Sequence, residues 1–486
     1  MQKIREDTMK LQAGTNGLVK AKVLLQALLA FGVVCFIVFS PAILDIVVFL
    51  GKRIPQVDVR TDYLKGLLLA ILLGLTIGAW PVSSQDKKAL WGLWAIKCVM
   101  MLGPMLVYEY TYQTDAFGYF SGARYDITQW KQMEMGWPNS PVVFIIWLHQ
   151  HTFFDSFHAS KVTFGMIGLL AIYIYYRAAV VFLRKERLML LFIFGLFPSI
   201  LFWSSTISKD PFVFLGIAVY CYGVIKWART GSTASAMIML SGIVLSAAIR
   251  YWLGFIIGIP ALIVTLQMIS VRNFRSRIIV SVMIVLVIAF FSSKVMHAFH
   301  LNSVKDLSTV ANDKYAGFAD GGSLVFEDKP RSEAAGVQSG AVVVKAPEAE
   351  ALKPAPALNA AAKKAKKKFK GISDVFIFVP RGIFTVLFRP FPGEVPNAFG
   401  LLAGIEALVL FALFTFAVIR ARFRKFKDPL VIWALSVILF WSAAYGFVSY
   451  NLGTVCRYRL QILPVFIGLM LYFAFMERGS LKSVKD

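Results

Sequence analysis

The chain has 486 residues, of which 58% are hydrophobic and only 16% are charged, with a mean hydropathy of +0.67. This composition excludes an ordinary soluble domain and predicts a bundle of membrane-spanning helices. The formal net charge of +24 is concentrated in short loops beside apolar segments, where anionic lipid headgroups are the natural partners, so we expect no nucleic-acid binding.

Twelve apolar stretches meet or approach the roughly 20 residues that a helix needs to cross a bilayer. In chain order they cover 22–48, 64–82, 89–108, 163–183, 188–206, 211–228, 235–249, 251–270, 278–294, 398–420, 429–448 and 459–476. Several contain Gly or Pro, which membrane helices tolerate because neighbouring groups can bind the freed backbone groups. We therefore predict an all-α polytopic membrane protein with about 12 transmembrane helices.

Lysine and arginine gather in alternate short loops, which are expected to face the cytoplasm. With twelve spans, this rule places both termini in the cytoplasm. The start of the chain is polar and charged, with no short apolar core before a small-residue cleavage site, so we expect no cleaved signal peptide.

Two long outer segments divide the chain into five parts. These are the N-terminal helices 1–108, an outer loop 109–162, a transmembrane core 163–294, a second outer loop 295–397, and the C-terminal helices with a cytoplasmic tail 398–486. The first loop is aromatic and contains the short apolar stretch Pro141–Leu148, which predicts interfacial helices. In the second, the Ala/Pro/Lys-rich segment 303–372 predicts a flexible stretch, either a solvated tether or a contact for anionic lipid or polymer.

Charged groups fall at the outer ends of the predicted helices. Asp115 follows the third span in a Tyr-rich segment. The other groups of this kind stand in four further outer turns, and they are Lys209, Asp210, Arg250, Arg389, Arg457 and Arg459. An acidic group among several cations at one membrane face predicts a site for an anionic, lipid-linked substrate.

The chemistry of a polyprenyl-phosphate sugar donor matches these residue types. Its leaving group is already a stable anion, so it needs cations and no carboxylic acid. A carboxylate is still needed to accept the proton of the attacking hydroxyl. We therefore predict Asp115 as the catalytic base and the cations as phosphate or sugar-acid ligands, with Asp210 orienting Lys209 or binding a sugar hydroxyl. The structural alternatives are helix capping by Asp115, a helix start at Lys209-Asp210-Pro211, and headgroup anchoring by the arginines.

A metal site is weakly indicated. His149 and His151 could bind a metal with help from Asp155 or His158, although an interfacial His beside Trp147 is more often a headgroup contact. No metal ligand and no cofactor is therefore firmly predicted, and the sequence leaves open whether the protein uses a divalent metal.

The segment Thr114-Asp115-Ala116, followed by Tyr119 and Ala123, resembles the start of the first outer loop in the GT-C superfamily of integral-membrane glycosyltransferases. Other stretches look similar to bacterial envelope-polysaccharide members of that superfamily, namely Pro198-Ser199 with Trp203 before Lys209-Asp210, Arg389-Pro390-Phe391-Pro392, and Arg457-Tyr458-Arg459 before Pro464. The sequence departs from many members in having two apparent spans before the one that leads into the acidic loop.

The resemblance implies a GT-C-like fold in a bacterial inner (cytoplasmic) membrane, with the active face extracytoplasmic. It implies transfer of a sugar from a polyprenyl-phosphate-linked donor to a glycan, lipid or protein acceptor, in envelope polysaccharide or glycolipid biosynthesis. The acidic residue of the first large loop, here Asp115, would act as the base or position the acceptor.

Two other functions remain open. A Wzy-like repeat-unit polymerase or a ligase would use the same outer arginines on a lipid diphosphate. A multispan transporter or flippase would use ionisable residues inside the spans, and Asp45, Lys97 and Glu406 are the candidates. We find no internal repeat, and the polar groups gather on one face, which favours the enzyme.

Overall fold

The computed structural model describes residues 41–112, 114–125, 139–268, 274–298, 306, 308–310, 312, 371–395, 397–421, 426–446 and 452–475. Within these residues the regular elements are all helical, with no strand. Six of the helices are long and apolar enough to cross a membrane, and a bent pair would make a seventh. This is consistent with a polytopic helical membrane protein.

The helices are named in chain order. They are η1 (Gly51–Arg53), α2 (Val59–Thr76), η2 (Ile77–Ala79), α3 (Ser84–Leu102), α4 (Pro104–Thr111), α5 (Asp115–Tyr125), α7 (Ser140–Thr152), α8 (Phe157–Leu183), α9 (Leu188–Leu196), α10 (Pro198–Trp203), α11 (Asp210–Thr230), α12 (Thr233–Ile249), α13 (Tyr251–Gln267), α14 (Phe274–Ala298), α17 (Ile372–Phe388), α18 (Ala398–Arg420), α19 (Pro429–Tyr445), α20 (Leu452–Arg459) and α21 (Leu463–Phe475).

Most predicted spans coincide with a helix. Those that match the six long candidates are 64–82, 89–108, 163–183, 211–228, 278–294 and 398–420. Three more appear as the shorter apolar helices α12, α13 and α19. The predicted span 188–206 is broken into α9 and α10, and 459–476 belongs to the α20–α21 pair, which bends by 69°. Most of 22–48 lies outside the described residues, so the count of twelve stays a prediction.

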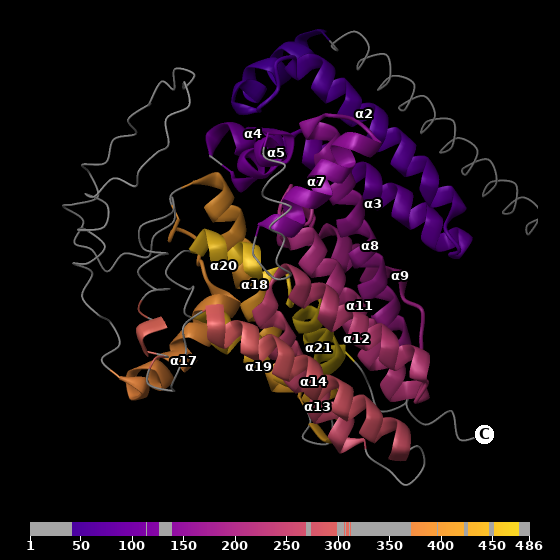
Figure 1. The fold of residues 1–486 in the computed structure, drawn as a ribbon, viewed down its shortest axis with the longest axis vertical. Coiled ribbons are helices and arrows are strands. Elements are labelled where there is room, and N and C mark those ends of the chain that lie inside the picture. The colour runs from indigo at the N-terminus through magenta and orange to yellow at the C-terminus, as the bar shows by residue number, and fades with distance from the viewer. Residues whose placement is uncertain are drawn as a thin grey trace, which may run out of the picture.

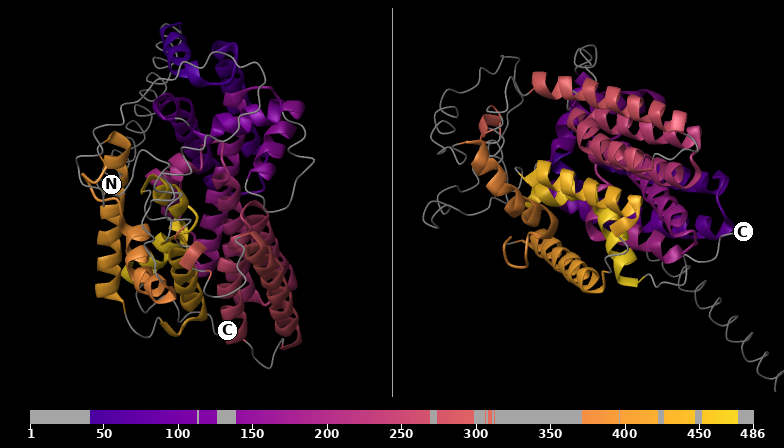
Figure 2. Two further views of the ribbon diagram at one scale, coloured as in Figure 1. Left: turned by 60° about the vertical axis from the view of Figure 1, so that its left-hand side comes forward. Right: turned by 90° about the horizontal axis from the view of Figure 1, so that it is seen from below.

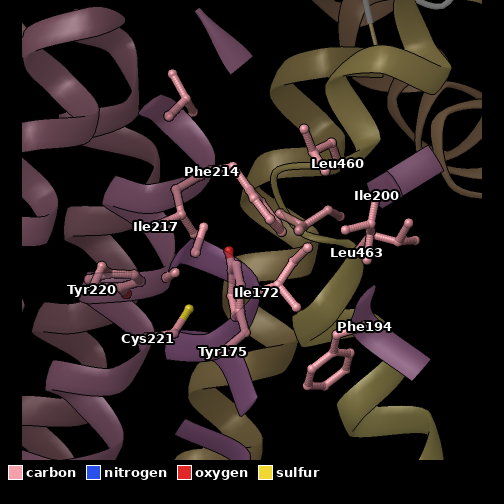
Figure 3. Close-up of a cluster of buried hydrophobic side chains, with 14 of the residues drawn as sticks. Ile172, Tyr175, Phe194, Ile200, Phe214, Ile217, Tyr220, Cys221, Leu460 and Leu463 are labelled. Carbon is pink, nitrogen blue, oxygen red and sulfur yellow. The ribbon is translucent and has the colours of Figure 1, made fainter. Parts of the chain in front are cut away.

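Helix α8 is the central element of the bundle. Ser156 caps its first turn by accepting a hydrogen bond from the Ala159 amide. The helix packs against α2, α3, α9 and α11. Figure 3 shows part of the resulting core, in which Tyr175 of α8 lies near Phe214 and Cys221 of α11. Among the C-terminal helices, α21 contacts both α18 and α19, and the three form a group beside this core (Figures 1 and 2). Contacts between α13 and α19 join this group to the rest of the bundle.

Helices α11 and α12 form a tight antiparallel hairpin. Gly231 ends α11 with φ +65°, a left-handed conformation that glycine adopts without steric cost. The backbones then approach closely, because a Cβ added to Gly242 would lie 2.3 Å from the Tyr220 amide nitrogen. The start of α11 and the end of α12 are therefore brought to the same end of the bundle.

The break between α9 and α10 is stabilised by two buried charged residues. Pro198 begins α10, and a helix start leaves backbone N–H groups without intrahelical partners. Glu406 of α18 accepts from the Ser199 amide and from the Ser199 hydroxyl, both at 2.6 Å. After the other end of α10, the Lys97 ammonium of α3 donates to the hydroxyls of Ser204 and Ser205 at 2.6 and 2.8 Å.

The segment 109–162, predicted as the first outer loop, contains α5 and α7, which contact each other. The predicted apolar stretch Pro141–Leu148 falls within α7. The predicted flexible segment 303–372 lies almost wholly outside the described residues. After it, the amphipathic α17 leads to the turn that holds Arg389 and Glu394.

Candidate functional site

Asp210 and Arg250 meet because of the α11–α12 hairpin. Asp210 is the first residue of α11, and Arg250 follows the last residue of α12. The Arg250 Nη2 donates to Asp210 Oδ1 at 3.0 Å, and both side chains are buried. The Ser208 hydroxyl also donates to Asp210 Oδ2, at 3.1 Å. The Asp210 carboxylate has no exposed surface, and it accepts hydrogen bonds from protein donors.

Arg457 joins this pair to Asp115. It lies on α20, before the sharp bend into α21. Its Nε donates to Asp210 Oδ2, and its Nη1 donates to Asp115 Oδ2 at 3.1 Å. The Asp115 side chain is 60% exposed and that of Arg457 is 21% exposed, so this side of the cluster is open to a ligand. Figure 1 shows α5 and α20, which carry these residues, toward the same end of the bundle.

Aromatic side chains hold Arg250 in place. Its guanidinium lies 4.1 Å from the centre of the Tyr458 ring, a cation–π distance. One nitrogen donates to the Tyr445 hydroxyl at 3.5 Å, and Trp252 Nε1 donates to the same oxygen at 2.9 Å. Arg250 is therefore a fixed, buried cation that faces Asp210.

Lys209 is a half-buried cation beside this cluster. Its Nζ lies 5.9 Å from the centre of the Tyr119 ring. Among the described residues no carboxylate lies within ion-pair distance of it. Burial, together with the positive charges of Arg250 and Arg457, lowers the pKa of Lys209 to about 8, against the opposing effect of Asp210 and Asp115. The ammonium therefore has spare capacity for an added anion.

The other two predicted cations do not join the Asp115–Arg457–Asp210–Arg250 chain. The Arg389 side chain pairs with Glu394. Arg459 is buried and donates to the backbone oxygens of Leu387 and Arg389, at 3.0 and 2.6 Å. Arg459 therefore fixes the end of α17, and within the described structure these two residues support α20 without lying in the cluster.

An aromatic cluster borders the site, and sequence reasoning did not single it out. The ring of Tyr108 lies edge-on to those of Phe202, Trp203 and Phe399, with centroids 5.2, 5.9 and 5.1 Å apart. The Arg457 guanidinium lies 5.9 Å from the centre of the Trp203 ring. Only the density of Tyr and Trp near these positions in the sequence could have indicated it.

The three histidines that the sequence offered as possible metal ligands each bond to a different partner. His158 bonds to Asp62, His151 Nδ1 lies 2.8 Å from the Trp147 oxygen, and His149 Nδ1 lies 3.2 Å from the Ser160 hydroxyl. In the part of the chain that the structure describes, no three His, Cys, Asp or Glu side chains are grouped to hold a metal.

Comparisons with family models, with curated proteins and with solved structures give no match for this chain.

Proposed function

We propose that the chain is an integral-membrane glycosyltransferase, which transfers a sugar from a polyprenyl-phosphate-linked donor to a glycan, lipid or protein acceptor at the outer membrane face. The observation that carries this proposal is the linked set of Asp115, Arg457, Asp210 and Arg250. It combines an exposed carboxylate with two oriented guanidiniums, of which Arg250 is buried and Arg457 is partly exposed.

The charge balance favours an anionic ligand. Lys209, Arg250 and Arg457 carry three positive charges against the two carboxylates, so one positive charge is left over. A phosphate that binds beside Arg457 would meet a planar guanidinium with a geometry suited to its oxygens, and Lys209 would add a point charge. Because these groups are already oriented by Asp210 and the aromatic rings, little reorganisation is needed as charge builds on the leaving phosphate.

The contact between Arg457 and Asp115 suggests how donor binding prepares the base. While Arg457 Nη1 bonds to Asp115 Oδ2, that carboxylate oxygen is occupied by the guanidinium. A phosphate that takes this donor frees Asp115. The freed carboxylate accepts the acceptor's hydroxyl proton, and the acceptor oxygen bonds to the anomeric carbon. The bond from that carbon to the phosphate oxygen breaks, and its electron pair stays on the polyprenyl phosphate beside the cations.

The test is an assay of the purified protein in lipid nanodiscs with a panel of labelled polyprenyl-monophosphate sugars, with and without chelator. The expected result is release of polyprenyl phosphate together with a new glycosidic bond. Asp115→Asn is expected to lower the rate by about 10²–10⁴-fold, the usual contribution of a general base. The matched control is Asp155→Asn, which changes another outer-loop carboxylate, paired with Arg124 and outside the cluster. No turnover with any monophosphate donor, or full activity in Asp115→Asn, contradicts the proposal.

A polymerase or ligase that acts on lipid diphosphates is the second candidate, because the same guanidiniums fit a diphosphate. It would lengthen a polyprenyl-diphosphate glycan in the assay above. A transporter would move its substrate without forming a bond. Lys97 and Glu406, which suggested transport, each hold one end of α10, and Asp45 pairs with Arg60 at an exposed position. These contacts account for all three ionisable residues by structural roles, without a transport function.

A further inference from the structure

A cavity lies along the bundle from the charged cluster. It has a volume of about 390 Å³ and opens between α8, α9, α11, α19 and α21. Its walls are mostly apolar, with Tyr175, Phe182, Phe194, Cys221, Trp433 and Tyr472 among them. Figure 3 shows Tyr175, Phe194 and Cys221 within the buried cluster that forms one wall.

Helix α11 gives the separation between the two sites. It begins at Asp210, in the charged cluster, and Cys221 lies 11 residues further on. At 1.5 Å per residue this is about 16 Å along the helix axis. Ile225, which also lines the cavity, is one turn beyond. The cavity therefore cannot hold a ligand group that also touches Asp115 or Arg457 unless that ligand runs along the bundle.

The rim of the cavity is basic. Lys185 and Arg187, from the short α8–α9 loop, both line it and are exposed. Glu186, the acidic residue between them, is held by Arg177 at 3.1 Å. Within the described residues neither Lys185 nor Arg187 forms an ion pair with a carboxylate. The charge distribution of the loops predicts that this loop faces the cytoplasm, where the membrane surface is anionic.

We propose that this cavity binds an acyl chain of an anionic glycerophospholipid from the cytoplasmic leaflet, with the lipid phosphate bound by Lys185 and Arg187. The volume lies within the usual range for ligand pockets. An apolar cavity of this size offers few hydrogen-bond partners to water molecules. An apolar ligand would restore the dispersion contacts that the lining atoms lack when the cavity is empty. In a bilayer the apolar group at hand is a lipid chain, and the basic rim selects the anionic headgroup. This inference does not depend on the proposed sugar transfer.

The test is native mass spectrometry of the full-length protein in mild detergent, titrated with phosphatidylglycerol or with phosphatidylcholine of the same acyl chains. We expect one phosphatidylglycerol to bind in preference. The double variant Lys185→Gln/Arg187→Gln should weaken this binding roughly 30-fold, since two surface cations are lost. Gly468→Leu should block lipid binding by filling the cavity, which Gly468 lines. The nearest atom to a Cβ added at this position is Phe194 Cζ at 4.0 Å, so the larger side chain enters the cavity without a backbone clash.

The matched control is Lys87→Gln/Lys88→Gln, which removes two basic residues from another predicted cytoplasmic loop outside the cavity. It should leave the affinity unchanged. Thermal unfolding in the same detergent verifies that every variant is folded. Equal binding of the two lipids, an equal loss in the control, or undiminished binding in a folded Gly468→Leu protein overturns the proposal. Preferential binding of polyprenyl phosphate overturns it as well, because the occupant would then be a donor lipid.

Discussion

Arg457 Nη1 lies 3.1 Å from Asp115 Oδ2, although 342 residues separate the two along the chain. The Nε of the same guanidinium is bonded to the buried Asp210. Arg457 is thus bonded to the buried carboxylate of Asp210 through Nε and to the exposed carboxylate of Asp115 through Nη1. A ligand that binds the exposed edge of Arg457 competes with Asp115 for the same N–H donor, and this relationship underlies the predictions that concern donor binding.

Arg457→Lys should weaken binding of the lipid-linked donor about tenfold or more. Lysine keeps the charge, but it has no planar fork with which to contact Asp210 and a phosphate together. The measurement is the Kd for a polyprenyl-phosphate sugar. The control is Arg53→Lys, because Arg53 lies near Tyr110 and outside the cluster. An equal Kd for the Arg457→Lys and parent proteins contradicts the assigned role.

Asp210→Asn should lower the free energy of unfolding by about 3–5 kcal/mol, because the buried Arg250 loses its carboxylate partner and Arg457 loses one of its two. Asp45→Asn should change it by no more than about 1 kcal/mol, because Asp45 and Arg60 are 70% and 55% exposed and such pairs contribute little. Chemical unfolding of both variants in detergent gives the comparison. Similar losses in the two would show that Asp210 has no special structural role.

Donor binding should weaken as pH rises through about 8. The Lys209 pKa is lowered to about 8, mainly by burial, so the side chain is charged below this pH and neutral above it. An ordinary lysine would stay charged to about pH 10. The measurement is donor Kd between pH 6.5 and 9.5. In Lys209→Arg the cation persists, so the decline near pH 8 should disappear; a decline that persists unchanged would assign it to another group.

Gly242→Leu should abolish donor binding and lower thermal stability, because the added side chain meets the Tyr220 backbone and forces α11 and α12 apart. Asp210 and Arg250 would then separate. Gly92→Leu is the matched control, since nothing lies within 4 Å of an added Cβ at this position in α3. Unfolding temperature and donor Kd are measured for both. A Gly242→Leu protein as stable as the parent would contradict the close helix contact.

Glu406→Ala should reduce stability by about 1–3 kcal/mol, because the Ser199 amide and hydroxyl at the start of α10 lose their acceptor in a buried place. If Glu406 instead carried a transported ion, the variant would lose substrate movement and keep its stability. Unfolding and proteoliposome flux, measured on the same preparation, distinguish the two roles.

Hydropathy alone located most of the helices, because a bilayer imposes a length and an apolar composition that can be read residue by residue. It could not show that 188–206 is interrupted at Phe197–Pro198, or that a 69° bend separates α20 from α21. Pro198 is a local signal for the first break, but the contact of the adjacent Ser199 with the distant Glu406 cannot be read from the sequence.

The charged cluster was predictable in part. Residue type and position at the helix ends singled out Asp115, Lys209, Asp210, Arg250 and Arg457. The sequence does not reveal that Asp210 faces inward between two arginines while Asp115 faces outward, since both begin a helix and differ only in tertiary surroundings. In the same way, Arg457 and Arg459 are two residues apart on α20, yet one faces the cluster and the other binds the carbonyls at the end of α17.

Helix α20, which carries Arg457, is synthesised long after the two acids that it connects. A ribosome delivers Asp115 and Asp210 to the membrane 342 and 247 residues before Arg457, the guanidinium that connects them. A nascent or prematurely terminated polypeptide therefore holds both acids without their shared counter-ion. On the proposed function, such fragments do not use the lipid-linked donor, so turnover begins only after α20 has been synthesised.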